Sequence, residues 1–325
     1  MEDALGGGRA RTVSKEGLFQ APWNFLGLGE ETSSRKCARG WVLPIPYEAT
    51  TSYGAGTGEG PAAIIAASRQ VELFDTEFGC EPALRYGVHT MEHMTPVVSS
   101  PEAMIGAVEQ AVYGILSGRP RPGSLAILGG EHSISAGTAR ALARLVPKGK
   151  LVCVQVDAHA DLRDKYEGSP YSHACAARRI VEVCPVFQIG IRNISAEEEV
   201  FRRKCRRVKT AFAGEAASAK GAFLADLARF VRGKDVFLTI DLDGLDPSIM
   251  PSVGTPEPGG ISWERTLEIA RVVAGNAARV PAFDVVELAP IAGLRAPDFL
   301  AAKLVYKILS YVLTNGSGKG VRRES

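Results

Sequence analysis

The sequence predicts a single doubly wound α/β domain, in which helices cover both faces of a parallel β-sheet. Short, continuous apolar runs alternate along the chain with segments of helical periodicity, which is typical of α/β proteins. The apolar runs show no polar alternation, as expected of parallel strands that are buried on both faces. No internal repeat and no long linker divides the 325 residues, so we expect one domain.

The strands are predicted from apolar runs that are too short and too continuous to be amphipathic helices. These runs are residues 41–45, 124–128, 151–156, 186–189, 236–240 and 280–286. Helices are predicted where apolar residues recur with helical spacing. These segments are residues 61–68, 136–145, 196–206, 219–231, 263–273 and 297–313.

Capping residues support two of the helices. Ser100 is suited to cap a helix that has Pro101 in its first turn and ends before Gly118. Ser195 and Glu198 have the spacing of a capping box. The apolar stripe of the first of these helices indicates packing in the core and no functional role.

Both ends of the chain are polar and rich in glycine, so they have little to bury. We expect residues 1–18 to be a disordered N-terminal segment and residues 315–325 to be a disordered tail. Residues 19–314 then form the folded domain.

The composition excludes several classes of protein. Hydrophobic residues make up 46% of the chain, enough for an ordinary globular core. A net charge of +2 gives no general attraction for nucleic acid or an anionic membrane. No apolar run approaches the roughly 20 residues of a membrane-spanning helix, and the N-terminus lacks a signal-peptide pattern. Six irregularly spaced cysteines, without a C-x-x-C pair, favour the reducing cytoplasm.

Polar residues alternate at the end of one predicted strand. Asp157, His159 and Asp161 follow residues 151–156, and extended backbone would point all three side chains the same way. Carboxylates at the end of a buried strand are costly unless something neutralises them. A bound cation would do so.

Two further strand ends repeat this arrangement. Asp241 and Asp243 alternate after residues 236–240, with Asp246 close behind, and His132 follows residues 124–128 through a glycine turn. Aspartates outnumber histidines and no cysteine joins them, which favours Mn²⁺ over a structural Zn²⁺. The three strand ends together predict a metal site.

Simpler interpretations exist for each motif alone. The segment from Asp241 to Asp246 is also suited to an Asx-type turn into Pro247, and His132 to a helix start. The glycines of residues 54–60 do not fit G-x-G-x-x-G, because Pro61 stands at the last glycine position. Residues 133–137 lack the first glycine of the serine-hydrolase elbow.

These motifs resemble the ureohydrolase family of arginases and agmatinases. The resemblance rests on G-G-E-H-S at residues 129–133, V-D-A-H-A-D at 156–161 and D-L-D-G-L-D-P at 241–247. It extends from about residue 24 to residue 313, including T-T-S-Y-G-A-G-T at 50–57, Y-S-H at 171–173 and F-D-V-V-E at 283–287. Glu131 departs from the family, which more commonly has aspartate there; we expect this to affect only local hydrogen bonding.

The resemblance implies an arginase-like fold, two Mn²⁺ ions per chain and a homotrimer or homohexamer. One ion would take His132 and Asp161, the other His159 and Asp243, and both would share Asp157 and Asp241. Asp161 would also pass a proton to the leaving amine. His173 would shuttle protons at the mouth of the site, and Glu287 would bind the guanidinium group.

The implied reaction is hydrolysis of agmatine to putrescine and urea, a step of polyamine biosynthesis. Aminopropylagmatine, guanidinobutyrate and arginine are alternative substrates. Arg163 stands where arginases typically have an asparagine for the substrate carboxylate, although Arg163 could itself bind a carboxylate. Asp164 and Glu167 could favour an amine tail or could simply face solvent. Two other classes remain open: a catalytically silent scaffold, and a histone-deacetylase-like enzyme with one zinc.

Overall fold

A computed structural model describes residues 22–218 and 221–315. Its centre is an eight-stranded, all-parallel sheet in the order β2-β1-β3-β8-β7-β4-β5-β6. The strands are β1 Gly40–Ile45, β2 Val88–Thr90, β3 Ser124–Gly129, β4 Leu151–Val156, β5 Val186–Ile191, β6 Val208–Phe212, β7 Asp235–Asp241 and β8 Arg279–Val286. The predicted fold class is confirmed.

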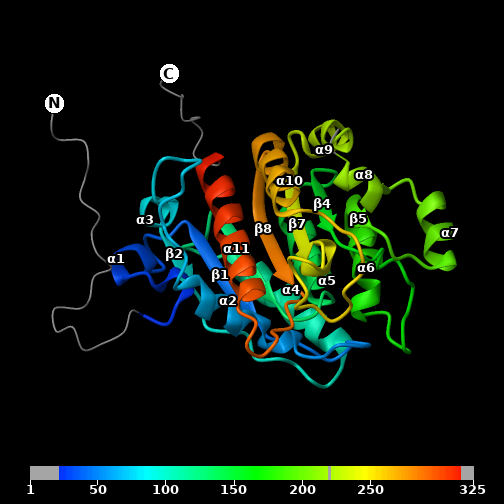
Figure 1. The fold of residues 1–325 in the computed structure, drawn as a ribbon, viewed down its shortest axis with the longest axis horizontal. Helices are drawn as coiled ribbons and strands as arrows, with labels where there is room; N and C mark the ends of the chain where they lie inside the picture. Colours follow the sequence, from blue (N-terminus) through cyan, green and yellow to red (C-terminus); the bar gives the residue numbers. More distant parts are fainter. Residues whose placement is uncertain (1–21, 219–220, 316–325) are drawn as a thin grey trace.

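Helices cover both faces of the sheet (Figure 1). They are α1 Glu30–Ser33, α2 Gly60–Ser68, α3 Pro82–Tyr86, α4 Pro101–Ser117, α5 Ile134–Leu145, α6 Ala176–Val183, α7 Ala196–Lys204, α8 Ala213–Ala217, α9 Phe223–Val231, α10 Trp263–Asn276 and α11 Ala296–Asn315. Helices α2, α9, α10 and α11 pack together on one face, and α4, α5 and α6 pack on the other.

The two faces of the sheet have separate apolar cores, because successive side chains of a strand point to opposite faces. Along β1, Val42 belongs to the core under α2 and α11, while Trp41 and Leu43 belong to the core under α4 and α5. Along β3, Ala126 belongs to the first of these cores and Ile127 to the second. Every residue of β1 and β3 is buried, which explains why these strands have continuous apolar sequences.

All six predicted strands are present, and two edge strands were missed. β2 is three residues long, too short to give a pattern. β6 contains Lys209, and only Val208 and Ala211 of its five residues are buried, because it pairs on one side only. Edge strands of this kind lack the continuous apolar run on which the prediction depended.

The predicted caps are present. Ser100 Oγ accepts a hydrogen bond from Ala103 N at 3.1 Å. In the capping box, Ser195 N donates to Glu198 Oε2 at 2.8 Å and Glu198 N donates to Ser195 Oγ at 3.3 Å. The short helices α1, α3, α6 and α8 were not predicted.

The expected disorder at both ends falls on residues outside the described part, apart from Asn315, which ends α11. The first two residues of the helix predicted at 219–231 also lie outside it, and α9 begins at Phe223. Within the described residues, no helix is long and apolar enough to cross a membrane.

Candidate metal centre

The carboxyl ends of the four central strands meet at one edge of the sheet. β3, β8, β7 and β4 are neighbours in that order, and all four are parallel. The residues that directly follow these strands therefore converge, as ligands do in open α/β sheets. His132 follows β3, Asp157 follows β4, Asp241 ends β7 and Glu287 follows β8.

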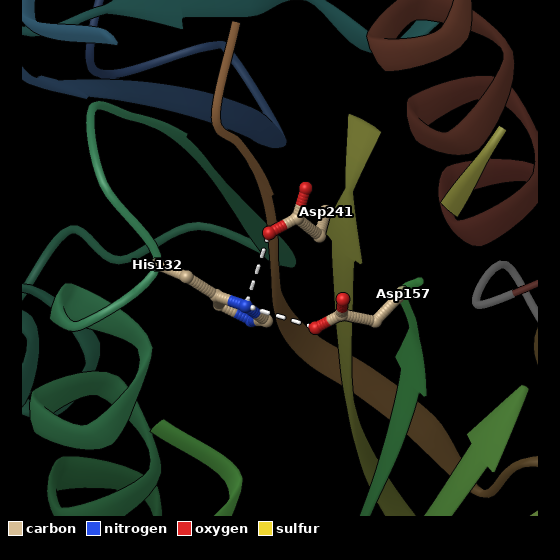
Figure 2. Close-up of side chains that lie close together, drawn as sticks. All are labelled: His132, Asp157 and Asp241. Carbon is tan, nitrogen blue, oxygen red and sulfur yellow. Dashed lines mark ion pairs between the residues drawn. The ribbon is translucent and has the colours of Figure 1, made fainter. Parts of the chain in front are cut away.

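His132 lies among carboxylates that come from different strands. Its Nδ1 atom is 3.2 Å from Asp157 Oδ2, 3.2 Å from Asp161 Oδ2 and 3.3 Å from Asp241 Oδ2. Figure 2 shows the ring between Asp157 and Asp241. The other ring nitrogen, Nε2, lies 2.9 Å from the hydroxyl of Thr239 on β7, which orients the ring.

The Nδ1 atom tests whether these residues suit a metal. It is buried, yet none of the nearby oxygens of the described residues has hydrogen-bonding geometry toward it. In a neutral ring that donates from Nε2, Nδ1 carries a lone pair. A lone pair facing three carboxylates is unfavourable without a cation among them. The arrangement fits a metal ion held by His132, Asp157, Asp161 and Asp241.

A second group of ligand atoms adjoins the first. His159 Nδ1 lies 2.8 Å from Asp243 Oδ2 and 3.8 Å from Asp157 Oδ1. Asp157 thus presents one oxygen to each group, and the two sets, His132 with Asp157 and Asp241 and Asp157 with His159 and Asp243, each suit one ion. All six predicted ligand residues are brought together.

Backbone groups fix the carboxylates of this second group. Asp157 Oδ1 accepts from His159 N at 2.6 Å, and Asp243 Oδ1 accepts from Ala158 N at 3.1 Å. Asp243 N donates to Asp241 Oδ1 at 2.9 Å. Asp243 lies in a 3₁₀ turn, Leu242–Gly244, directly after β7. Two of these hydrogen bonds each lie within one loop, and the bond from Ala158 N to Asp243 joins the two loops, so together they fix the candidate ligand atoms relative to one another.

The clustered charges shift protonation strongly. Burial, together with the charge of Asp157, raises the pKa of Asp161 to about 6. Burial and the charges of Asp243 and Asp157 raise the pKa of Asp241 well above its usual range. Burial lowers the pKa of His159, but the hydrogen bond to Asp243 and the surrounding carboxylates outweigh it and raise it to about 10. Divalent cations would replace these protons.

Buried polar residues inside the strands support the candidate ligands and were not predicted. Gln155 Nε2 donates to Asp157 Oδ2 at 2.7 Å, and Gln188 Nε2 donates to Gln155 Oε1 at 2.9 Å. Asp284 of β8 accepts from Ser135 Oγ at 2.7 Å, and burial raises its pKa to about 6. The available signal was a polar residue within an otherwise apolar strand.

Arg192 was also missed. Its guanidinium donates to backbone carbonyls on two loops, including those of Asp243 at 2.7 Å and Glu257 at 2.9 Å. It also donates from Nε to Pro258 O at 3.1 Å. The loop that carries Asp243 is thus tied to the loop at residues 257–258. No sequence pattern identified this residue.

Two site residues have unusual backbone conformations. Asp161 has φ of 52° and Glu287 has φ of 67°, a region that non-glycine residues rarely adopt. Glu287 is buried beside the ligands, and its Oε1 accepts from His132 N at 2.6 Å. Such conformations persist where the surrounding structure imposes them, which is common at functional sites.

The pocket above the ligands is lined by His173, Glu287 and both histidines of the centre. Arg163, Tyr166 and Glu198 also line it. Arg163 lies over the ring of Tyr166, 5.1 Å from its centroid, and its Nε is 3.9 Å from Glu198 Oε2.

The expectation that Asp164 and Glu167 favour an amine tail finds no support, since neither lines the pocket. Asp164 pairs with Arg178 and Arg179. Asp246 forms an Asx-type turn, accepting from Ser248 N at 2.8 Å, and Asp241 forms one with Asp243 N; of the two, only Asp241 belongs to a group of candidate ligand atoms.

Comparison with known proteins identifies the family. A sequence model described as "Arginase family" matches residues 38–310. The chain belongs to the arginase family. Among its relatives are the N(1)-aminopropylagmatine ureohydrolase of Synechocystis, 39% identical over 83% of this chain and 88% of the relative, and an agmatinase of Pyrococcus horikoshii, 30% identical over 82% and 90%.

Solved structures of the arginase family agree with this membership. The agmatine ureohydrolase of Thermoplasma volcanium superimposes with a TM-score of 0.77, covering 91% of this chain and 96% of its own, at 28% identity. The prediction of an agmatinase-type ureohydrolase, a hydrolase of the arginase family, is therefore confirmed.

Proposed function

We propose that this chain is a manganese-dependent ureohydrolase that hydrolyses the guanidinium group of N1-aminopropylagmatine and releases urea. The observation that carries the proposal is His132 Nδ1, buried among three carboxylate oxygens at 3.2–3.3 Å, with Glu287 hydrogen-bonded beside it. A site of this composition suits divalent cations and a positively charged substrate group together.

Two Mn²⁺ ions are assigned to the centre. His132 and Asp161 would hold one, His159 and Asp243 the other, and Asp157 and Asp241 would bridge them. Asp157 has the clearest bridging position, because its two oxygens face different histidines. When bound, the ions would supply Lewis-acid activation of water at neutral pH. Oxygen-rich ligation without cysteine favours Mn²⁺ over a structural Zn²⁺.

Glu287 is assigned to the guanidinium group. Burial raises the pKa of its carboxyl well above the usual range, so a cationic partner is needed for it to ionise. One of its oxygens already accepts from His132 N, which orients the carboxylate. A guanidinium would supply both the charge and paired N–H donors.

Proton transfer is assigned to Asp161 and His173. Asp161 lies beside Nδ1 of His132, where its carboxylate would take up the proton that the attacking water loses. It would pass the proton to the nitrogen of the departing amine as the bond between this nitrogen and the guanidinium carbon breaks. His173 lines the pocket and is half-buried, so it would exchange protons with solvent.

Part of the pocket lining suits a substrate with an extended amine tail. Tyr53 lines the pocket and is exposed, so its aromatic face would attract an alkylammonium group. The guanidinium of Arg163 stacks over the ring of Tyr166 and lies 3.9 Å from the carboxylate of Glu198. These contacts disfavour binding of a substrate carboxylate by Arg163. Relatives named as aminopropylagmatine ureohydrolases reach 39% identity, which supports the longer substrate.

Agmatine is the second candidate substrate, yielding putrescine and urea. It shares the guanidinium and the four-carbon chain and lacks only the aminopropyl extension. The agmatinases at 29–30% identity favour it specifically. A homotrimer or homohexamer and a cytoplasmic location stay predictions.

The test is urea release from a matched panel: aminopropylagmatine, agmatine, guanidinobutyrate and arginine, with manganese supplied. We expect the highest kcat/KM for aminopropylagmatine. Sites with buried polar partners can discriminate by roughly 10⁴-fold, so the ranking should be clear. Arginine as the best substrate would contradict the amine-tail assignment, and no urea from any compound would favour a silent scaffold. Asp241→Asn serves as the control with strongly reduced activity.

A further inference from the structure

Glu131 anchors the loop at residues 49–50, which lies against His173. Its side chain is fully buried, and both oxygens are occupied. Oε2 accepts from Ala49 N and Thr50 N, both at 2.6 Å. Oε1 accepts from Thr50 Oγ1 at 2.6 Å and from Ser133 Oγ at 2.5 Å. With four donors directed at it, the carboxylate acts only as an acceptor.

Thr50 connects this carboxylate to His173. A hydroxyl has one proton, and that of Thr50 points to Glu131 Oε1. Thr50 Oγ1 can therefore act only as a hydrogen-bond acceptor toward His173. It accepts from the backbone N of His173 at 2.9 Å and lies 3.3 Å from the ring atom Nδ1. The favourable ring state has its proton on Nδ1.

We propose that Glu131, acting through Thr50, is a positioning residue that fixes the tautomer of His173. Nδ1 carries the proton in the neutral ring, and Nε2 is left as the basic nitrogen. Because His173 lines the pocket, this selects which nitrogen accepts a proton there. The catalytic part of this inference rests on the proposed function, whereas the tautomer itself does not.

Two other hydroxyls contact the ring without determining its state. Ser172 Oγ lies 3.3 Å from Nδ1, and Ser52 Oγ lies 3.4 Å from Nε2. Each can rotate to donate or accept, so each adapts to the ring. Thr50 cannot rotate freely, since turning its proton away would leave Glu131 Oε1 without that donor. The directional constraint comes from Glu131.

The first test reads the tautomer by ¹⁵N NMR of labelled imidazole rings, in protein loaded with diamagnetic Zn²⁺. The wild type and Thr50→Ser should show His173 protonated on Nδ1. Thr50→Val keeps the shape but loses the acceptor, and should shift protonation toward Nε2. A wild-type ring protonated on Nε2, or a Thr50→Val spectrum identical to wild type, would overturn the proposal.

Glu131→Gln provides a second, opposite perturbation. Two fixed backbone N–H groups should hold the amide oxygen at the Oε2 position, which places the amide NH₂ toward Thr50 Oγ1. The Thr50 proton would then be free to turn to Nδ1 and favour protonation on Nε2. Retention of the Nδ1 proton in this variant contradicts the chain of contacts.

Glu48→Gln is the matched control. Glu48 anchors the same loop through Gly56 N at 2.8 Å, Gly58 N at 2.9 Å and Thr51 Oγ1 at 3.5 Å, and among the described residues its side chain forms no hydrogen bond with Thr50 or His173. Its ring spectrum should match the wild type. Ser172→Ala should also match, and a change there without one in Thr50→Val would assign the constraint to Ser172 and overturn the proposal.

A double-mutant cycle gives the catalytic readout. Thr50→Val should lower kcat roughly tenfold, the scale of one hydrogen bond, with metal content unchanged. In a His173→Ala background, Thr50→Val should cost nothing further. Fully additive losses would mean that Thr50 acts independently of His173. A wild type that releases no urea would reject the proposed function and leave the NMR result standing.

Discussion

His159 makes the stability of the metal-free chain depend on pH. Its imidazole contacts Asp243 at 2.8 Å, and the folded state raises its pKa from 6.5 to about 10. A raised histidine pKa contributes stability that is fully present below pH 6.5 and is lost as pH rises through about 10. The folded state raises the pKa of Asp161 from 3.8 to about 6, so the stability that its proton contributes is lost as pH rises from 3.8 to about 6. Asp161 and His159 therefore both make the metal-free chain less stable as pH rises.

The expected size follows from the His159 shift. Between pH 6.5 and 8.5, the unfolded imidazole loses its proton while the folded one keeps it, which removes about 2 kcal/mol of stability. For a chain of 325 residues, this corresponds to a fall of roughly 3 °C in Tm. Bound Mn²⁺ requires neutral His159, so the stabilisation by metal should grow over the same interval.

The assay is thermal unfolding in EDTA and in Mn²⁺ at both pH values, with His159→Asn as the control. The variant lacks the titrating ring, so its metal-free Tm should fall less than that of the wild type. An identical pH dependence in both proteins would refute the assignment to His159. If the increase in Tm from EDTA to Mn²⁺ were smaller at the higher pH, ligation by the neutral His159 ring would be refuted.

Other substitutions should separate metal binding, substrate binding, proton transfer and folding. Asp241→Asn should lower turnover roughly 100-fold with native circular dichroism, since a ligand charge is lost; retained turnover in manganese-replete buffer removes Asp241 from the centre. Glu287→Gln should lower kcat/KM by roughly 10- to 100-fold, and unchanged efficiency would place the guanidinium elsewhere. His173→Ala should reduce turnover while elemental analysis still finds two Mn²⁺ per chain; a metal-free variant would make it a ligand. Gly130→Ala should prevent folding, because its Cβ would overlap the Tyr47 carbonyl oxygen; a native yield contradicts this.

The sequence predicted the site residues correctly wherever their position depended on a single strand and the loop that follows it. The spacing of acidic residues and histidine at the ends of β4 and β7 located Asp157, His159, Asp161, Asp241 and Asp243. The extended backbone expected there was wrong in part, because Asp243 lies in a 3₁₀ turn and Asp161 has φ of 52°. The convergence of these residues could be expected from the parallel sheet. The pairing of β3 with β8, and hence the contact of Glu287 with His132, is a property of the strand order that no local pattern contains.

Interactions between loops could not be predicted from the sequence. Glu131 was expected to change only local hydrogen bonding, yet its contacts reach Thr50, 81 residues away in sequence. Asp164 is acidic and near the site in sequence, but it forms ion pairs with two arginines of α6 and does not line the pocket. Charge type alone therefore did not establish which residues face the substrate; side-chain direction depended on packing between distant elements.

The position of β8 has a consequence for synthesis of the protein. This strand joins β2-β1-β3 to β7-β4-β5-β6, and the chain reaches it only at residues 279–286. A growing chain can pair the strands on either side, but β3 and β7 are not neighbours, so no strand pairing joins the two half-sheets until β8 is available. His132 on one half and Asp157 on the other are thus brought together late. Uptake of metal should mark near-completion of the chain, and fragments that end before β8 should lack the centre.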